Sequence, residues 1–256
     1  MDRFRESSGE NSPAVLNTTN ELAVMYYEQG KYSEAENLLN QCGPKMREVF
    51  GESHPSTLAN TNRLAMIYQA QQKYDQAAVL YKQCLDKKKA LLGENDPSTL
   101  HTMNNLAMSL DRQQKYREAK VLYKQCLDKQ RAILGENASD TLSTMLNLAL
   151  VHFHQNEFED AEALNKQCYL KNKALLGENH PNTLSAMNNL AMTLDRLERY
   201  AEAEALYLKC LEKRKVVLGK RHVDTIDTMK GLIRILALIG KTTESIAMFK
   251  SIENFY

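Results

Sequence analysis

Residues 96–137 read DPSTLHTMNNLAMSLDRQQKYREAKVLYKQCLDKQRAILGEN, and this stretch decides the fold. Asp96 and Pro97 predict the start of a helix, because aspartate caps free backbone N–H groups and proline at the first helical position loses no hydrogen bond. Apolar residues follow at spacings of three and four, which places them on one helical face: Leu100, Met103, Leu106, Ala107 and Leu110. We expect a turn at 113–115, then a second apolar stripe that ends at Gly135 in a left-handed helix cap. The stretch therefore predicts a helical hairpin.

The hairpin pattern recurs every 42 residues without an insertion. Cysteine and glycine show the period most plainly: Cys42, Cys84, Cys126, Cys168 and Cys210, with Gly51, Gly93, Gly135, Gly177 and Gly219. A single hairpin cannot bury both of its apolar stripes, so neighbouring hairpins must stack into one array. We therefore predict an all-α fold, an α-solenoid of tandem antiparallel helix hairpins.

The period sets the expected boundaries within the 256 residues. A polar N-terminal tail at 1–12 is followed by repeat 1 at 13–53, repeat 2 at 54–95, repeat 3 at 96–137, repeat 4 at 138–179, repeat 5 at 180–221, and a partial or capping repeat 6 at 222–256. The array replaces the two separate domains that chain length alone favours.

Two repeats depart from the common pattern. Repeat 1 has Gly43 and Pro44 in the middle of its second helix, where we expect a kink or an early end because proline removes a backbone hydrogen bond. Repeat 4 changes residues that its neighbours share, which predicts either a different ligand contact or looser packing of its first helix. Its distinctive residues are Ser139, Leu146, His152, Phe153, His154 and Asn165.

Composition excludes several classes of protein. The chain has 33 basic and 32 acidic side chains, and 43% of its residues are hydrophobic. This balance is that of an ordinary globular protein and not of a disordered or strongly basic one. No run approaches the ~18 apolar residues that span a bilayer, and Met1–Pro13 has no apolar signal core. We expect a cytoplasmic protein.

The positions of small and large residues in repeat 2 resemble those of the tetratricopeptide repeat: Leu64, Ala65, Tyr68, Tyr74, Ala77, Tyr81 and Cys84. The 42-residue period and the phrases GENHP at 177–181 and NNLA at 188–191 resemble, more narrowly, the repeat region of kinesin light chains. The resemblance implies a right-handed superhelix whose first helices line a concave groove. It also implies a non-catalytic scaffold or adaptor that binds an extended peptide motif. Only about a dozen residues precede repeat 1, so the heptad segment that pairs light chains with a motor is not expected.

The resemblance places the residues around each Leu-Ala pair of the first helices on the groove. Asparagine offers two donors and two acceptor lone pairs, which match the backbone of an extended peptide of any sequence, and methionine adapts to varied apolar side chains. The predicted peptide-binding residues are Asn62, Arg63, Asn104, Asn105, Met108, Arg112, Asn147, Asn188, Asn189, Met192 and Arg196. Two alternatives stay open: the amides bond the next repeat, and the methionines fill gaps between first helices. Six first helices about 10 Å apart would hold up to about 15 residues of ligand.

No catalytic site, metal site or cofactor is expected. The sequence has no nucleophile elbow, phosphate-binding loop or zinc-protease motif. The five cysteines are equivalent by the repeat, and helices about 8–10 Å apart exceed the ~7 Å limit for a disulfide, so we expect small buried hydrophobes. His152 and His154 are two residues apart on a helix and point to different sides.

The expected partner is a protein or peptide with a linear motif. Lys87–Lys89 are expected on a solvated outer face of a second helix, so neither nucleic acid nor a membrane is predicted as a partner. Self-association through the terminal repeats is possible. The alternative function is a structural spacer or the sensing arm of a larger multidomain protein, used through its convex or lateral surfaces.

Overall fold

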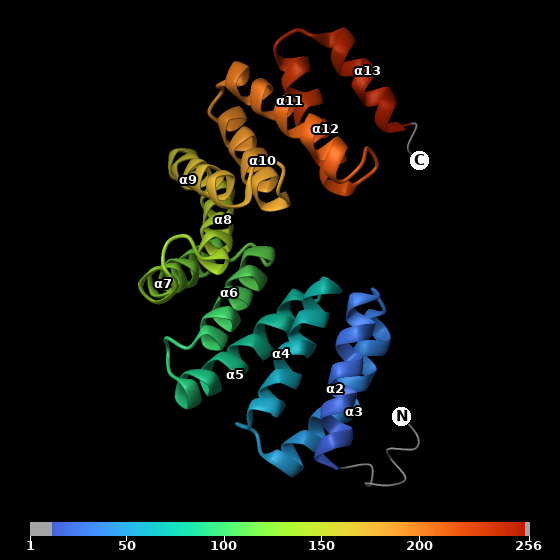
Figure 1. The fold of residues 1–256 in the computed structure, drawn as a ribbon, viewed down its shortest axis with the longest axis vertical. Coiled ribbons are helices and arrows are strands. Elements are labelled where there is room, and N and C mark those ends of the chain that lie inside the picture. Colours follow the sequence, from blue (N-terminus) through green and yellow to red (C-terminus); the bar gives the residue numbers. More distant parts are fainter. Residues whose placement is uncertain (1–11, 254–256) are drawn as a thin grey trace. The chain divides into compact units, whose positions relative to one another are not determined.

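The computed structural model describes residues 12–253, in which it contains twelve helices and no strand (Figure 1). The helices are α2 (Pro13–Glu28), α3 (Tyr32–Phe50), α4 (Pro55–Ala70), α5 (Tyr74–Leu92), α6 (Pro97–Arg112), α7 (Tyr116–Leu134), α8 (Ser139–His154), α9 (Phe158–Leu176), α10 (Pro181–Arg196), α11 (Tyr200–Val217), α12 (Val223–Leu238) and α13 (Thr242–Glu253). The predicted all-α class of tandem hairpins is confirmed. Each pair of helices falls inside one of the six predicted repeat ranges. Of the predicted polar tail, residues 1–11 lie outside the described residues.

The chain divides into two compact units, residues 1–133 and 134–256. In each unit, the second helix of a repeat packs against its own first helix and against the first helix of the next repeat, as α3 does with α2 and α4, and α9 with α8 and α10. Successive first helices also contact one another, for example α2 with α4 and α10 with α12. We call the surface formed by α2, α4 and α6 the first-helix wall of unit 1, and that formed by α8, α10 and α12 the first-helix wall of unit 2.

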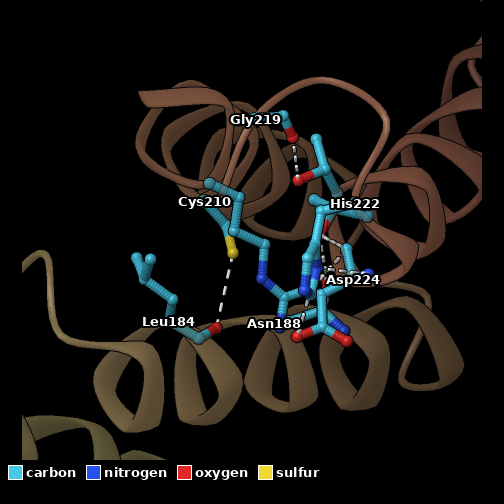
Figure 2. Close-up of polar contacts among 9 residues, drawn as sticks. Leu184, Asn188, Cys210, Gly219, His222 and Asp224 are labelled. Carbon is cyan, nitrogen blue, oxygen red and sulfur yellow. Dashed lines mark hydrogen bonds and ion pairs between the residues drawn. The ribbon is translucent and has the colours of Figure 1, made fainter. Parts of the chain in front are cut away.

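The first helices begin where the sequence predicts. Asp96 accepts hydrogen bonds from the backbone N–H groups of Ser98, at 2.8 Å, and Thr99, at 3.3 Å. Histidine replaces this aspartate in repeats 2, 5 and 6, where its Nδ1 accepts the bond from the N–H two residues later, as His222 does from Asp224 (Figure 2). A polar acceptor at this position thus fixes the start of each of these helices.

Positive φ angles mark two kinds of turn. Inside the hairpins of repeats 2 to 5 a non-glycine residue has φ of 60–62°, as Gln114 does in the predicted turn at 113–115. After the second helices, Gly93 has φ 90° and ψ 164°, and Gly177 has φ 87° and ψ 167°. These glycines end the helices as predicted, but their extended ψ corrects the predicted left-handed cap, because this region of backbone space is open essentially to glycine alone.

Helix α3 continues through Pro44 to Phe50, so the early end expected in repeat 1 is wrong. Pro44 has no N–H for the carbonyl of Asn40, but both residues are exposed, so that carbonyl faces solvent and not the core. None of the helices in residues 12–253 has the length and apolar character that crossing a membrane requires.

Candidate functional site

In unit 1, the first-helix wall carries three of the predicted asparagines. Asn62 is buried, and its Oδ1 accepts a hydrogen bond of 3.3 Å from the Thr102 hydroxyl of the next repeat. Arg63 forms an ion pair of 2.8 Å with Glu21, the equivalent residue of repeat 1. Asn104 is half-buried, and Asn105 is 7% exposed. Asn62 and Arg63 therefore already have partners inside the unit.

In unit 2, the two neighbouring asparagines of α10 have different surroundings. Asn188 is 3% exposed, and its Oδ1 accepts a hydrogen bond of 3.0 Å from the Thr228 hydroxyl. Its Nδ2 lies 3.5 Å from the sulfur of Met192. Asn189 and its equivalent in repeat 4, Asn147, are half-buried. Within residues 12–253, no hydrogen bond involves the side-chain amide of Asn147 or Asn189.

A buried cation joins the bonded asparagines to the next repeat. In unit 2, Arg214 donates to the Thr228 hydroxyl at 2.7 Å and to the Asp224 carbonyl at 2.6 Å, and Thr228 donates in turn to Asn188 (Figure 2). In unit 1, the Lys88 ammonium donates to the Thr102 hydroxyl at 2.9 Å, and Thr102 donates to Asn62. We call each of these chains of bonds the cation–threonine–asparagine network.

Lys88 corrects the predicted solvated face at Lys87–Lys89. Only 7% of Lys88 is exposed, and burial lowers the pKa of its ammonium. Lys87 is partly exposed and pairs with Glu52 at 2.7 Å. Successive residues of a helix point about 100° apart, so the three lysines cannot all lie on the solvent-exposed side of α5. Only one of them turns toward the next repeat.

The cysteines lie in the core. All five are buried and free, and each thiol donates to the carbonyl of the residue 26 positions earlier, at 3.3–3.7 Å. Figure 2 shows this contact for Cys210 and the carbonyl of Leu184. Burial raises the pKa of the Cys210 thiol, which keeps it protonated. The predicted role as small buried residues fits this environment.

The remaining predicted residues lie farther along the walls. Met108 and Met192 are half-buried, whereas Arg112 and Arg196 are exposed. The Arg196 guanidinium stacks on two aromatic rings, 5.0 Å from the centre of Phe158 and 5.8 Å from that of Phe153. These contacts hold the exposed guanidinium beside α8 and α9.

A small notch beside Asn189 was not predicted as part of the site. It is lined by Leu150, Phe153, Asn165, Asn189, Met192 and Thr193, and its volume is about 10 Å³. The notch exists because Asn165 stands where repeats 2, 3 and 5 have a fully buried tyrosine. Its Nδ2 donates to Thr193 at 3.2 Å, while its Oδ1 is buried without a partner. The loss of the tyrosine in repeat 4 was the sequence signal for this feature.

Unit 1 has a larger cavity, of about 580 Å³, between α3, α4 and α5. It lies at Gly43, which occupies the position of the buried Leu85, Leu127 and Leu211 in other repeats. Asn60, in place of the threonine of repeats 3, 4 and 6, reaches toward Gly43, because a Cβ there would come within 2.9 Å of its Oδ1. The rim carries both Arg47 and the Lys87–Glu52 pair.

Tandem hairpins, in which the second helices within a unit pack on the next first helix, are typical of α-solenoid interaction scaffolds. Models of the tetratricopeptide repeat match residues 15–56, 56–132, 98–170, 140–215 and 196–256. The chain belongs to the tetratricopeptide repeat family, whose fold is typically non-catalytic. A search of curated proteins finds no significant relative.

One of two similar solved structures supports the narrower resemblance, and the other shows the shared fold. One is a Podosopora anserina protein assigned to the kinesin light chains, with nearly identical TPR-like repeats. It is 25% identical to this chain with a TM-score of 0.71, and the match covers 80% of this chain and 97% of that one. BtubC (BKLC) from P. vanneervenii is 18% identical with a TM-score of 0.67, and the match covers 94% of this chain and 90% of that one. The predicted resemblance to kinesin light chain repeats is confirmed.

Proposed function

We propose that this chain is a non-catalytic adaptor that binds an extended peptide along its first-helix walls, in the manner expected of a kinesin-light-chain-like scaffold. The supporting observation is the division between adjacent asparagines. The side chain of Asn188 hydrogen-bonds Thr228 of the next repeat. Asn147 and Asn189 occupy the same position in successive repeats, and their side-chain amides have no hydrogen-bond partner among the described residues. A half-buried amide without a partner gains free energy when a ligand backbone supplies one.

The wall of unit 2 has the size and chemistry for a short segment. Three first helices about 10 Å apart form a wall of about 20–30 Å, which fits six to nine extended residues at about 3.3 Å each. Asn147 and Asn189 would pair with backbone groups of the peptide. Met192 would contact apolar side chains, and the exposed guanidinium of Arg196 would pair with a carboxylate.

The structure offers little support for a strongly acidic ligand. Of the cations near the walls, Arg63 pairs with Glu21, and Arg234 pairs with Asp195. These ion pairs neutralise much of the positive charge on the first-helix walls. Charge should therefore contribute less to the binding of a peptide than the asparagine amides do. The proposed ligand is therefore an extended peptide of mixed composition with at most one or two acidic residues.

Peptides selected from a random displayed library on the full chain provide the test. The double variant Asn147→Ala and Asn189→Ala should weaken the selected peptides at least about tenfold, the effect of about 1.4 kcal/mol of lost hydrogen bonding. Asn37→Ala, on the exposed side of α3, is the control and should leave affinity unchanged. Selected peptides that bind the double variant as tightly as the wild type would refute the proposal.

A second candidate is a spacer or sensing arm that binds through a lateral surface, which the 580 Å³ cavity of unit 1 favours. The double variant Gly43→Leu and Asn60→Thr restores the residues of other repeats and should fill this cavity. A partner that is lost on this change, or on Lys87→Glu, and that tolerates the asparagine variants would favour the lateral surface. Lys88 is unsuitable for charge reversal because it is buried.

A further inference from the structure

Three potential metal ligands meet at the turn between α8 and α9. His152 lies in the last turn of α8, Glu157 is the residue before α9, and Asp160 lies in the first turn of α9. The Nδ1 atom of His152 is 2.5 Å from Glu157 Oε2 and 3.6 Å from Asp160 Oδ2. The three ligand atoms all lie within 4.8 Å of one another. The sequence predicted no metal site here, because His152 and His154 point to different sides of their helix.

Repeat 4 alone combines these residues. At the position of Glu157, every other repeat has a base: Lys31, Lys73, Lys115, Arg199 and Lys241. At the position of His152 the other repeats have tyrosine or leucine. In repeats 1 and 2 the lysine lies over the tyrosine ring, with 5.7 Å and 5.3 Å between its Nζ and the ring centre. Repeat 4 thus replaces an aromatic–cation pair with an imidazole and a carboxylate.

The replacement changes what the turn requires. Elsewhere the local charge at this position is positive, whereas Glu157 and Asp160 bring two carboxylates to one imidazole nitrogen. Two lone-pair atoms 2.5 Å apart, such as Nδ1 and Oε2 here, have either a proton or a metal ion between them. The Nδ1–H of a neutral imidazole is enough for a hydrogen bond to Glu157, whereas a divalent ion in its place would use both carboxylates of the turn.

We propose that His152, Glu157 and Asp160 bind a divalent transition-metal ion, with zinc as the best fit. Imidazole nitrogen with two carboxylate oxygens is a donor set that zinc accepts, and the nitrogen disfavours calcium and magnesium. A tetrahedral zinc ion with bonds of about 2.0–2.1 Å separates its ligand atoms by about 3.3 Å. Glu157 Oε2 would have to move away from Nδ1 by about 0.8 Å, a shift within reach of a glutamate rotamer.

The burial of the ligands suits an open site. The side chain of His152 is 6% exposed, that of Glu157 is 36% exposed and that of Asp160 is 70% exposed. The imidazole is therefore fixed by the core, while the carboxylates face the entry path and leave a fourth position for water or a partner's side chain. The bound ion would clip α8 to α9 in repeat 4.

Zinc alone is the probe, added to the full chain after treatment with chelator and dialysis. The wild type should bind one zinc ion per chain by calorimetry and elemental analysis, with no binding of magnesium or calcium. His152→Leu introduces the residue of repeats 3, 5 and 6, and Glu157→Lys that of most repeats, so both variants should fold. Each should lose zinc binding up to about 100 μM metal.

The control variant is His154→Gln, which removes the neighbouring histidine outside the cluster and should bind zinc as the wild type does. All these variants keep the five cysteines, so zinc held by thiols would persist in His152→Leu and would overturn the proposal. An absorption spectrum of the cobalt form without thiolate charge-transfer bands is the supporting result. A wild type that takes up no zinc would show that a proton bridges His152 and Glu157, and would also overturn it.

Discussion

The substitution Thr228→Val tests whether the cation–threonine–asparagine network holds successive repeats together. Valine keeps the shape of threonine and removes the hydroxyl that receives the Arg214 bond and donates to Asn188. The lost bond to a charged group costs about 1.5–3 kcal/mol, and the stranded Asn188 oxygen, 3% exposed, costs about 1–3 kcal/mol more. Because the hydroxyl proton is shared with the Asp224 carbonyl, we take the lower part of this range, about 3 kcal/mol.

Urea unfolding followed by circular dichroism measures the loss, and the melting temperature should fall by about 6–12 °C. The matched control is Thr18→Val, since Thr18 occupies the same position in repeat 1, is exposed and bonds only the carbonyl of Ala14. In an Arg214→Met background, which copies the buried Met46 of repeat 1, Thr228→Val should cost about 1.5 kcal/mol less. A loss below about 0.5 kcal/mol, or equal losses in both backgrounds, would refute the network.

Three further predictions follow from departures from the repeat. Ala186→Thr introduces the threonine that other repeats have at this position, so its hydroxyl can accept a hydrogen bond from the unpaired Nδ2 of Asn172. The free energy of unfolding in urea should rise by about 1 kcal/mol, and a decrease would contradict this. Gly43→Leu with Asn60→Thr should add about 1.5–3 kcal/mol by burying a leucine, and a crystal structure should show the cavity of unit 1 filled. Hydrogen bonds from three lysines lower the pKa of Glu178 to about 2. The ionised carboxylate should therefore stabilise the fold fully above pH 4.5, and this stabilisation should disappear as the pH falls toward 2. Carboxyl NMR titration of wild type and Glu178→Gln checks this, and an ordinary pKa would exclude it.

The repeat pattern predicted the hairpins because each apolar stripe reappears in the same register five times, and the capping residues mark the helix starts. The pattern predicted less well which side of a helix a polar residue faces. Asn188 and Asn189 are adjacent and identical, yet a rotation of about 100° turns one toward Thr228 and leaves the other on the wall. The burial of Lys88 was missed for the same reason.

A signal for the network was present in the sequence. Thr102 follows Asn62 by 40 residues, and Thr228 follows Asn188 by 40, while Lys88 and Arg214 each lie 26 residues after the asparagine. A pair of long polar side chains at one repeat position, each with a threonine in the next repeat, indicates a buried bond between the repeats. Single residues judged only against their sequence neighbours do not reveal it.

The loss of this network in repeat 4 bears on where a ligand would act. Leu146 and Ala186 replace the asparagine and the threonine, and α9 is left with two buried polar atoms without partners, Asn165 Oδ1 and Asn172 Nδ2. Each such atom costs about 1–3 kcal/mol, which lowers the stability that the packing of α9 provides.

In a stacked array, a weak interface affects its neighbours little, because stability is a sum of local terms. Repeat 4 can therefore carry this cost without unfolding the repeats beside it. Asn165, which carries one of these atoms, lines a notch with Asn189 and Met192, and His152, Glu157 and Asp160 lie in the same repeat. Unsatisfied buried groups persist where function uses them more readily than where packing alone decides. Repeat 4 and the adjoining α10 are thus the part of unit 2 where both proposed binding sites find their physical basis.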